Sequence, residues 1–166
     1  MMKTMELFLW RHADALAGSP DAQRELSPLG HEQARRVAEW LMARAPADLR
    51  LLVSPAARAR QTAAYFQGNK EDIQICPQLY DSLSPDDILT LLEWPFLAAP
   101  TLVVGHQPLI GALAARLLSD SSFPGAFRKS ALWCLHVEHG QNNARLIQIV
   151  DGDMNLQPDS SPKPTT

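Results

Sequence analysis

Cysteine is scarce in this sequence, and its two cysteines, Cys76 and Cys134, lie in apolar segments without the spacing of metal ligands. Buried free thiols in a reducing compartment are the favoured interpretation, while a single disulfide between them stays open. Long apolar runs are also missing, since no window approaches the roughly 18 consecutive apolar residues of a membrane span. The apolar run at residues 6–10 is too short for a signal peptide. The sequence therefore predicts a cytoplasmic protein without a membrane partner.

An excess of positive charge is missing as well. The formal net charge of the 166 residues is −3 and the isoelectric point is about 5.9, which argues against nucleic-acid binding through broad counterion release. Any positive field must therefore be local. The length and the 46% share of hydrophobic residues suit one globular domain, which we place at residues 1–152. Prolines among serine, threonine, aspartate and lysine predict a disordered tail at residues 153–166.

Apolar segments with strand and helix periodicity alternate along the chain, which predicts an α/β fold. Three helices are expected to begin at Ser-Pro pairs, where the serine caps the helix and the proline occupies its first turn. These pairs are Ser27-Pro28, Ser54-Pro55 and Ser84-Pro85, and a fourth helix begins near Pro108. Strands are expected at residues 6–10, 49–53, 73–76, 101–104, 131–137 and 145–151. The loop at residues 13–26 is long for a strand-to-helix connection, and such loops are often functional.

Three of the expected strands lead into cationic or imidazole side chains. Arg11-His12 follows the first strand, Arg58 follows the second after a short turn, and His106 follows the strand at residues 101–104. In an open α/β sheet, ligands bind in the crevice outside the carboxyl ends of the strands. The two arginines and two histidines are therefore expected to converge on one pocket, and their charge suits a phosphoryl group.

His12 is the candidate nucleophile for phosphoryl transfer without a metal or a cofactor. A neutral imidazole attacks phosphorus through its unprotonated nitrogen, so the other ring nitrogen should donate to a backbone carbonyl or a carboxylate. Arg11 and Arg58 are expected to neutralise the phosphoryl oxygens, because a guanidinium stays ionised and forks onto phosphate. His106 is expected to donate a hydrogen bond to a phosphoryl oxygen as an imidazolium, whose charge the anion favours.

Four separated blocks of sequence carry a further signal. They are Arg11-His12-Ala13, then Leu26-Ser27-Pro28-Leu29-Gly30 with Gln33-Ala34, then Val53-Ser54-Pro55 with Arg58-Ala59 and Gln61-Thr62, and finally Gly105-His106. In this order they resemble the histidine phosphatase superfamily, except that Ala13 stands where its Arg-His-Gly signature has glycine. The short chain, Arg24 ahead of Leu26-Ser27, and the segment 104–109 look most similar to the SixA-type phosphohistidine phosphatases.

The resemblance implies a three-layer α/β/α sandwich, phosphoglycerate mutase-like, with a mixed, mostly parallel sheet. It implies that His12 takes the phosphoryl group as a covalent intermediate, which water then hydrolyses. Arg11, Arg58 and His106 carry over as the phosphate pocket, and Arg24 in the first loop carries over as a further phosphate ligand. Neither a cofactor nor a metal ion is implied.

A general acid is the remaining part of such a site. Larger members of the superfamily use a carboxylate after the middle of the chain, and Asp81 in Leu79-Tyr80-Asp81 is the nearest equivalent here, with Asp21 in the long loop behind it. Asp14 is instead expected to shape the pocket. SixA-type relatives often lack the acid, because phosphohistidine leaves as an imidazole that accepts a proton itself, whereas an alkoxide needs one supplied.

These residues predict a phosphatase that removes phosphate from a phosphorylated histidine of a protein, such as a histidine phosphotransfer domain, in signal transduction. A small-molecule phosphomonoesterase of the same superfamily stays open, and so does a module that binds phosphorylated partners without turnover. An intact His12 with both arginines favours the enzyme, because binding alone needs no in-line nucleophile. His136 and His139 have the spacing of a metal pair, but a solvated or hydrogen-bonded role is favoured because no third ligand follows.

Overall fold

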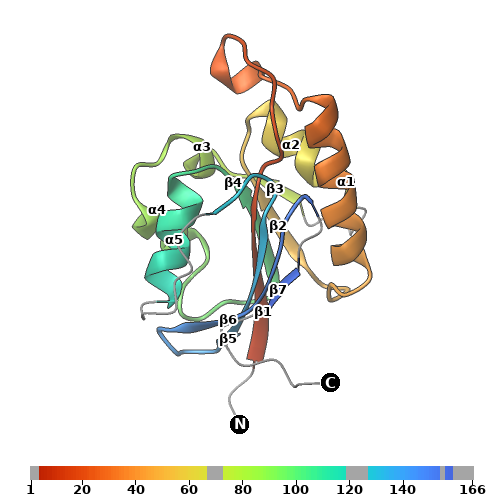
Figure 1. Cartoon of the computed structure of the whole chain (residues 1–166). Helices are drawn as coiled ribbons and strands as arrows, with labels where there is room; N and C mark the ends of the chain where they lie inside the picture. Colours follow the sequence, from red (N-terminus) through yellow and green to blue (C-terminus); the bar gives the residue numbers. More distant parts are fainter. Residues whose placement is uncertain (1–3, 67–72, 119–126, 154–155, 159–166) are drawn as a thin grey trace.

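The computed structural model describes residues 4–66, 73–118, 127–153 and 156–158. Their central feature is a seven-stranded sheet in the order β3-β2-β4-β1-β5-β6-β7 (Figure 1). The strands are β1 (Thr4–Arg11), β2 (Arg50–Val53), β3 (Ile73–Ile75), β4 (Thr101–Gly105), β5 (Leu132–Glu138), β6 (Ala144–Val150) and β7 (Leu156–Pro158). All six strands predicted from the sequence are present, and their ends differ from the prediction by two residues at most.

The sheet is mixed. β3, β2, β4 and β1 pair in parallel, whereas β1, β5, β6 and β7 pair antiparallel. All strands except β5 and β7 therefore run in the same direction. In the parallel half, Arg11 pairs with Gly105 and Val53 pairs with Val104, so β1, β2 and β4 end at the same edge. This edge is where an open α/β sheet binds ligands.

Helices cover both faces of the sheet, and the result is the predicted three-layer sandwich (Figure 1). They are α1 (Pro28–Met42) and α2 (Ala57–Ala64) on one face, and α3 (Gln78–Asp81), α4 (Pro85–Leu91) and α5 (Leu109–Leu118) on the other. Successive side chains of β1 point to opposite faces of the sheet, so this strand contributes to the hydrophobic core on both faces. Phe8 and Trp10 pack with α1 and α2, whereas Leu7 and Leu9 pack with α4 and α5.

Two of the three Ser-Pro pairs begin helices as predicted. The Ser27 side chain accepts a hydrogen bond from the Gly30 backbone N–H at 3.0 Å, and α1 starts at the following proline. Ser84 caps α4 in the same way. Ser54 does not cap a helix, because α2 begins only at Ala57. The Ser54 hydroxyl instead accepts the Ala56 N–H within the turn at 3.2 Å and faces the site described below.

Part of the segment predicted to be a disordered tail is ordered. Leu156–Pro158 forms β7, which pairs with β6, so the prediction was wrong for these three residues. Most of the remaining tail lies outside the described residues. Cys76 and Cys134 are both buried and free, as expected, and burial raises the pKa of both thiols.

Gly30 in the first turn of α1 lies directly against the chain that follows β1. A Cβ atom added at this glycine would lie 1.9 Å from the Asp14 carbonyl oxygen, far inside van der Waals contact. We expect Gly30→Ala to lower the free energy of unfolding by about 3 kcal/mol, because the helix or the loop must shift. Urea denaturation measures this change. Gly105→Ala is the matched control, since no atom lies within 4 Å of its added Cβ; equal losses in both variants would contradict the prediction.

Candidate active site

Side chains from three separate elements meet at the edge where the parallel strands end. His12 follows β1, His106 follows β4, and Arg58 lies in the first turn of α2. The two imidazole centroids are 5.0 Å apart, and Nε of Arg58 lies 3.4 Å from Nε2 of His12. Both His12 and Arg58 are buried. The spatial convergence predicted for these residues is therefore present.

The His12 ring is held in one orientation by the backbone. Its Nδ1 lies 2.7 Å from the Ala13 carbonyl oxygen and donates a hydrogen bond to it, which leaves Nε2 unprotonated and facing Arg58. Burial above all, and then the nearby charges of Arg58 and Arg11, lower the pKa of His12 to about 4 against the opposing effect of the Ala13 bond. His12 is therefore a neutral imidazole at pH 7, and its unprotonated Nε2 accepts a hydrogen bond from the Nε–H of Arg58.

The chain after His12 is fixed by hydrogen bonds from α1 and α2. The Ala13 N–H donates to Oγ1 of Thr62 at 3.1 Å, and the Asp14 N–H donates to Oε1 of Gln33 at 3.0 Å. The Asp14 carboxylate accepts bonds from Ser27 at 2.6 Å and from Lys129 at 2.8 Å. Asp14 thus anchors the pocket wall, and alanine is accommodated at the position where the signature has glycine.

Arg11 approaches the site from the last position of β1. Its Nη1 donates to the Phe127 carbonyl oxygen at 2.8 Å, while its Nε is buried without a hydrogen bond to any described residue. Burial lowers the pKa of the Arg11 guanidinium, although an arginine stays a cation in proteins. Its charge lowers the pKa of both His12 and His106, so Arg11 adds to the positive field around the two imidazoles.

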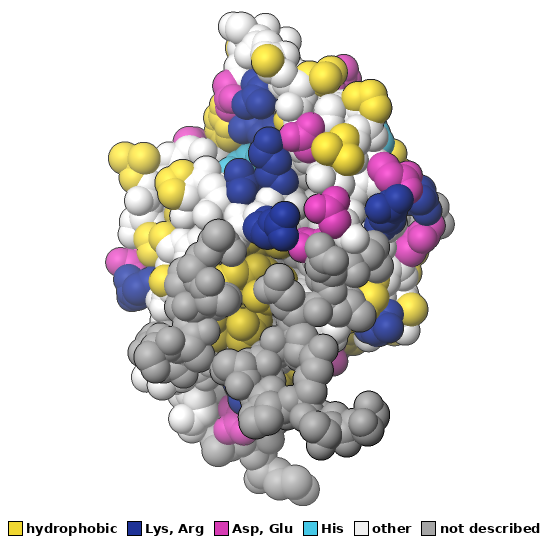
Figure 2. Space-filling view, in the orientation of Figure 1, with side chains coloured by type: hydrophobic (Ala, Val, Ile, Leu, Met, Phe, Trp, Pro, Cys, Tyr) yellow, Lys and Arg dark blue, Asp and Glu magenta, His cyan; other side chains and the backbone are white. Residues whose placement is uncertain are grey.

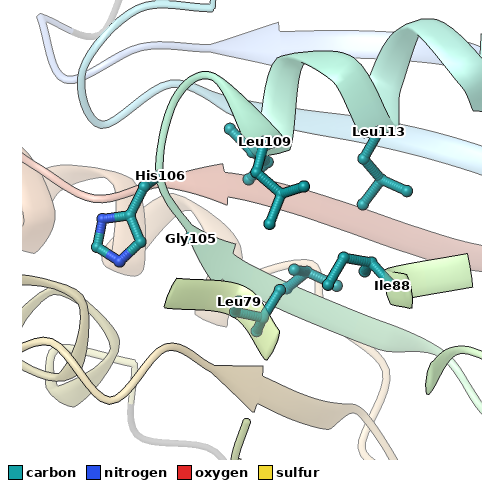
Figure 3. Close-up of a pocket in the computed structure, with 8 residues that line it drawn as sticks. Leu79, Ile88, Gly105, His106, Leu109 and Leu113 are labelled. Atoms are coloured by element: carbon teal, nitrogen blue, oxygen red, sulfur yellow. The ribbon is translucent and has the colours of Figure 1, made fainter. Parts of the chain in front are cut away.

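His106 sits between a polar and an apolar neighbourhood. Its Nε2 lies 2.7 Å from the Ser54 hydroxyl oxygen. On the other side, Figure 3 shows apolar side chains next to it, including Leu79 and Leu109. Burial, followed by the charges of His12 and Arg58, lowers the pKa of His106 to about 3. This environment disfavours a charge and keeps His106 neutral, and the imidazolium was expected only beside a phosphoryl anion that favours its charge.

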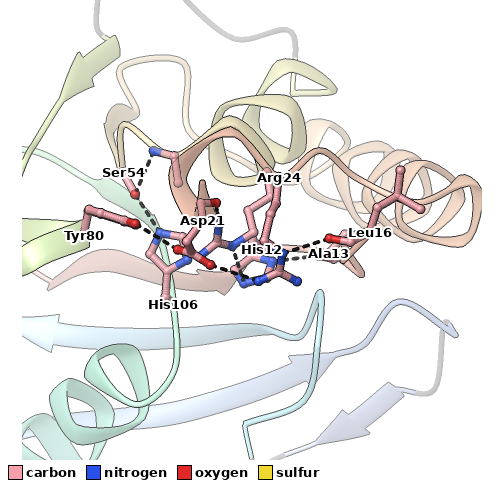
Figure 4. A network of polar contacts seen from close by, with 10 residues as sticks. His12, Ala13, Leu16, Asp21, Arg24, Ser54, Tyr80 and His106 are labelled. Carbon is pink, nitrogen blue, oxygen red and sulfur yellow. Dashed lines mark hydrogen bonds and ion pairs between the residues drawn. The ribbon is translucent and has the colours of Figure 1, made fainter. Parts of the chain in front are cut away.

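The long first loop places Asp21 against Arg58, and Figure 4 shows Asp21 together with Arg24 and Tyr80. Nη1 of Arg58 donates to the Asp21 carbonyl oxygen at 2.8 Å, and Nη2 donates to its Oδ2 at 3.0 Å. Oδ1 accepts from Arg24 at 3.0 Å, and Oδ2 also accepts from the Tyr80 hydroxyl at 2.9 Å. The Tyr80 hydrogen bond, then those of Arg24 and Arg58, hold the pKa of Asp21 well below its usual range. In this arrangement Asp21 is an ionised carboxylate and holds no proton to donate.

The remaining two residues predicted for the site are Asp81 and Arg24. Asp81 is the exposed last residue of α3, whereas its neighbour Tyr80 reaches the site and lies edge-on to His106, with ring centroids 5.7 Å apart. Arg24 is engaged with Asp21 and donates its Nε to the Leu16 carbonyl oxygen at 2.8 Å.

Sequence reasoning missed three contributors to the site, Tyr80, Ser54 and Thr62. Two of them had a signal in the quoted blocks: Ser54 stands in Val53-Ser54-Pro55, and Thr62 ends the Gln61-Thr62 pair. The helix-capping role assigned to Ser54 concealed its contact with His106. Tyr80 could have been found only as the neighbour of Asp81.

The histidines outside the site have ordinary partners. Nδ1 of His31 lies 2.7 Å from the Tyr65 hydroxyl, and the ring of His139 packs edge-on to Phe96 with centroids 5.2 Å apart. Within residues 4–66, 73–118 and 127–153, no group of three or more histidine, cysteine, aspartate or glutamate side chains is arranged to hold a metal ion. His136 and His139 therefore do not form part of such a group.

Comparison with known proteins identifies the family. The sequence profile of the histidine phosphatase superfamily (branch 1) matches residues 7–82. Phosphohistidine phosphatase SixA of Escherichia coli (strain K12) is 30% identical over an alignment of 145 residues, and the match covers 83% of this chain and 89% of that protein. The chain belongs to the histidine phosphatase superfamily. As a member of this superfamily it is a phosphatase, with SixA as a curated relative.

Solved structures of the superfamily share the fold over almost the whole chain. The structure of the protein histidine phosphatase SixA complexed with tungstate superposes with a TM-score of 0.78 at 28% identity, covering 90% of this chain and 98% of that one. A structure from Nakamurella multipartitia that carries the SixA name gives a TM-score of 0.77 at 26% identity, covering 96% and 98%. The predicted fold class is thereby confirmed. None of the described helices combines the length and apolar character that a membrane span requires.

The low pKa of His12 predicts an unusual acid limb in the pH profile. Because the nucleophile must be unprotonated, kcat/KM should stay level from pH 7 to 5 and halve near pH 4, instead of near the ordinary histidine pKa of about 6.5. The depressed pKa also means that the unfolded chain binds the proton more strongly, so stability falls as the pH drops through 6.5 towards 4. Initial rates should therefore be measured where circular dichroism shows folded protein. A half-maximal rate at pH 6.5 would contradict the prediction.

Proposed function

We propose that the protein removes the phosphoryl group from a phosphorylated histidine of another protein through a covalent intermediate on His12. The observation that carries this proposal is the hydrogen bond from Nδ1 of His12 to the Ala13 carbonyl oxygen, which leaves Nε2 unprotonated beside Arg58. A neutral nitrogen facing a buried guanidinium is the arrangement that attack on an anionic phosphorus requires. A module that only bound phosphate would gain nothing from it.

The reaction takes two displacements at phosphorus. In the first, the Nε2 lone pair of His12 forms the new N–P bond as the P–N bond of the substrate breaks. The leaving imidazole keeps that electron pair and takes a proton from water. In the second, a water oxygen attacks phosphorus, the bond to Nε2 breaks with its electron pair returning to His12, and the released proton passes to solvent. Orthophosphate leaves and the neutral imidazole is restored.

The remaining pocket residues stabilise charge on the phosphoryl oxygens. Arg58 and Arg11 supply fixed positive charge near His12, and preorganised charge of this kind costs no rearrangement as the transition state forms. His106 is the third ligand. Its neutral ring already carries one N–H that can donate to a phosphoryl oxygen, and a phosphoryl dianion beside it would raise its pKa and so favour the imidazolium as well.

The arrangement of carboxylates supports phosphohistidine over a phosphate ester as the substrate. Asp21 is ionised and tied to Arg58, while Asp81 is exposed at the end of α3. Hydrolysis of an ester needs a proton for the departing alkoxide, whereas an imidazole needs none from the enzyme. We therefore expect Asp81→Asn to leave phosphohistidine hydrolysis unchanged.

A protein partner also fits the surroundings of the site. Figure 2 shows lysine and arginine side chains gathered beside a histidine on one face, in a chain whose net charge is negative. Next to the site lies an open cavity of about 360 Å³, where Lys129 and Arg128 form ion pairs with three aspartates of the lining, Asp14, Asp151 and Asp153. An acidic surface around a phosphohistidine, as on a histidine phosphotransfer domain in cytoplasmic signalling, suits this face.

A comparison of substrates tests the proposal. The initial rate of phosphate release is measured with a phosphohistidine-bearing transfer domain, an aryl phosphate and an alkyl phosphate at equal concentrations. The proposal predicts a preference of about 100-fold or more for the phosphohistidine, because neither ester finds a proton donor. Faster release from the esters, lost in Asp81→Asn, would identify a phosphomonoesterase instead. No release from any of the three would identify a binding module.

A further inference from the structure

Asp21 accepts hydrogen bonds from both terminal nitrogens of the Arg58 guanidinium. Its backbone carbonyl oxygen accepts from Nη1 at 2.8 Å, and its carboxylate oxygen Oδ2 accepts from Nη2 at 3.0 Å. These two nitrogens form the outer fork of the side chain, which arginine commonly uses to bind an anion. The outer fork of Arg58 is therefore engaged by the protein itself.

The other edge of the same guanidinium faces the nucleophile. The Nε–H of Arg58 donates to Nε2 of His12 at 3.4 Å, whereas Nη1 and Nη2 make the contacts to Asp21. A guanidinium is planar and carries its donors in a fixed arrangement, so fixing the outer fork also fixes the direction of the Nε–H. The position of Asp21 thus determines which donors of Arg58 point at the phosphoryl position.

Asp21 is itself held from two sides (Figure 4). Arg24 binds Oδ1 at 3.0 Å, and the Tyr80 hydroxyl binds Oδ2 at 2.9 Å. The loop that carries Asp21 is closed at its base, where Leu16 N–H donates to the Glu25 carbonyl oxygen at 2.8 Å. A half-exposed carboxylate with partners on both oxygens keeps one orientation better than a carboxylate with a single ion pair.

We propose that Asp21 is a positioning residue that holds Arg58 with its Nε edge turned towards the phosphoryl group on His12, and that Arg24 and Tyr80 fix the Asp21 carboxylate. The proposal rests on the role of Arg58 as a phosphate ligand. Arg24 then binds the Asp21 carboxylate in addition to making the phosphate contact expected from the family resemblance. The proposal also gives Tyr80 a function that the sequence did not indicate.

A double-mutant cycle on orthophosphate binding tests whether Asp21 acts by positioning Arg58. Calorimetry gives the Kd of orthophosphate for the wild type, Asp21→Asn, Arg58→Ala and the double variant. In the wild-type background we expect Asp21→Asn to weaken binding about tenfold, since a charge-assisted contact that orients Arg58 is lost. In the Arg58→Ala background the same change should leave the Kd unchanged or tighten it, because only the repulsion between Asp21 and phosphate remains. Asp21→Glu, which keeps the carboxylate, should recover part of the affinity.

The reversal between backgrounds separates positioning from a structural role, since loss of stability would weaken binding in both. Tighter binding in Asp21→Asn would mean that the carboxylate competes with phosphate, and equal weakening in both backgrounds would mean that it acts without Arg58; either result overturns the proposal. If Arg58→Ala binds orthophosphate as the wild type does, the role of Arg58 fails as well, while a covalent adduct on His12 would still stand. Asp86→Asn removes a carboxylate from the surface ion pair with Arg116 and should change nothing.

Discussion

Asparagine in place of His12 is expected to abolish phosphate release, lowering kcat by about 10⁴-fold or more. The amide nitrogen of asparagine has no available lone pair, so no bond to phosphorus can form. Binding of orthophosphate should survive, because Arg11, Arg58 and His106 remain. The measurements are the rate of phosphate release from a phosphohistidine protein and the appearance of an acid-labile phosphoryl adduct on the enzyme.

His139→Asn is the matched control for this loss. His139 is exposed on the β5–β6 hairpin and packs against Phe96, so the same substitution there should leave both readouts at the wild-type level. An adduct that persists in His12→Asn would show that another group accepts the phosphoryl. That result would remove the nucleophile from the proposed mechanism even if the pocket still binds phosphate.

The second large effect is expected at Arg58. Arg58→Lys keeps the positive charge but replaces a planar fork with a single ammonium, which cannot bind Asp21 and face His12 together. We expect kcat/KM to fall about 10³-fold, in the range seen when a guanidinium that stabilises phosphoryl transfer is lost. Steady-state kinetics with the phosphohistidine substrate measure this change.

Arg60, two residues further along α2, provides the control for Arg58. It is exposed to solvent, so Arg60→Lys should stay within about twofold of the wild-type kcat/KM. If Arg58→Lys also retained nearly full activity, charge alone would suffice at this position. The account of a directed guanidinium would then be wrong.

Burial explains why Arg58 needs a partner in the free protein. Its side chain is only 7% exposed, and a cation that loses its water must be compensated by an anion or by hydrogen bonds. Asp21 supplies both before any phosphate is present. Asp21 therefore neutralises part of the positive charge of the site. This lowers the free energy needed to keep two arginines close to two imidazoles in the folded protein.

The sequence predicted the fold well because its signals were local. Strand periodicity and the Ser-Pro pairs located the elements, and the rule for parallel sheets placed Arg11, His12 and His106 at one edge. Even the Nδ1 partner of His12 belonged to a predicted class, a backbone carbonyl. The helix start at Ser54 failed because that serine bonds to a side chain 52 residues away, which no local pattern reveals.

The protonation states of Asp21 and His106 could not be predicted from the sequence, because they depend on contacts between residues far apart in the chain. Asp21 was considered as a proton donor, yet its hydrogen bonds to Tyr80, Arg24 and Arg58 keep it ionised. Two of those partners lie 37 and 59 residues away along the chain. The neutral state of His106 likewise depends on burial by α3 and α5, which only the assembled structure shows.

The central claim is that the phosphoryl group passes through Nε2 of His12. The most direct test is phosphorus NMR of the adduct, trapped by rapid denaturation in alkali after mixing the enzyme with a phosphoramidate donor, together with peptide mapping. The hydrogen bond from Nδ1 to the Ala13 carbonyl oxygen predicts a single phosphohistidine at position 12 that is substituted on Nε2. Phosphate on Nδ1, on another residue, or on no residue during active turnover would contradict the account.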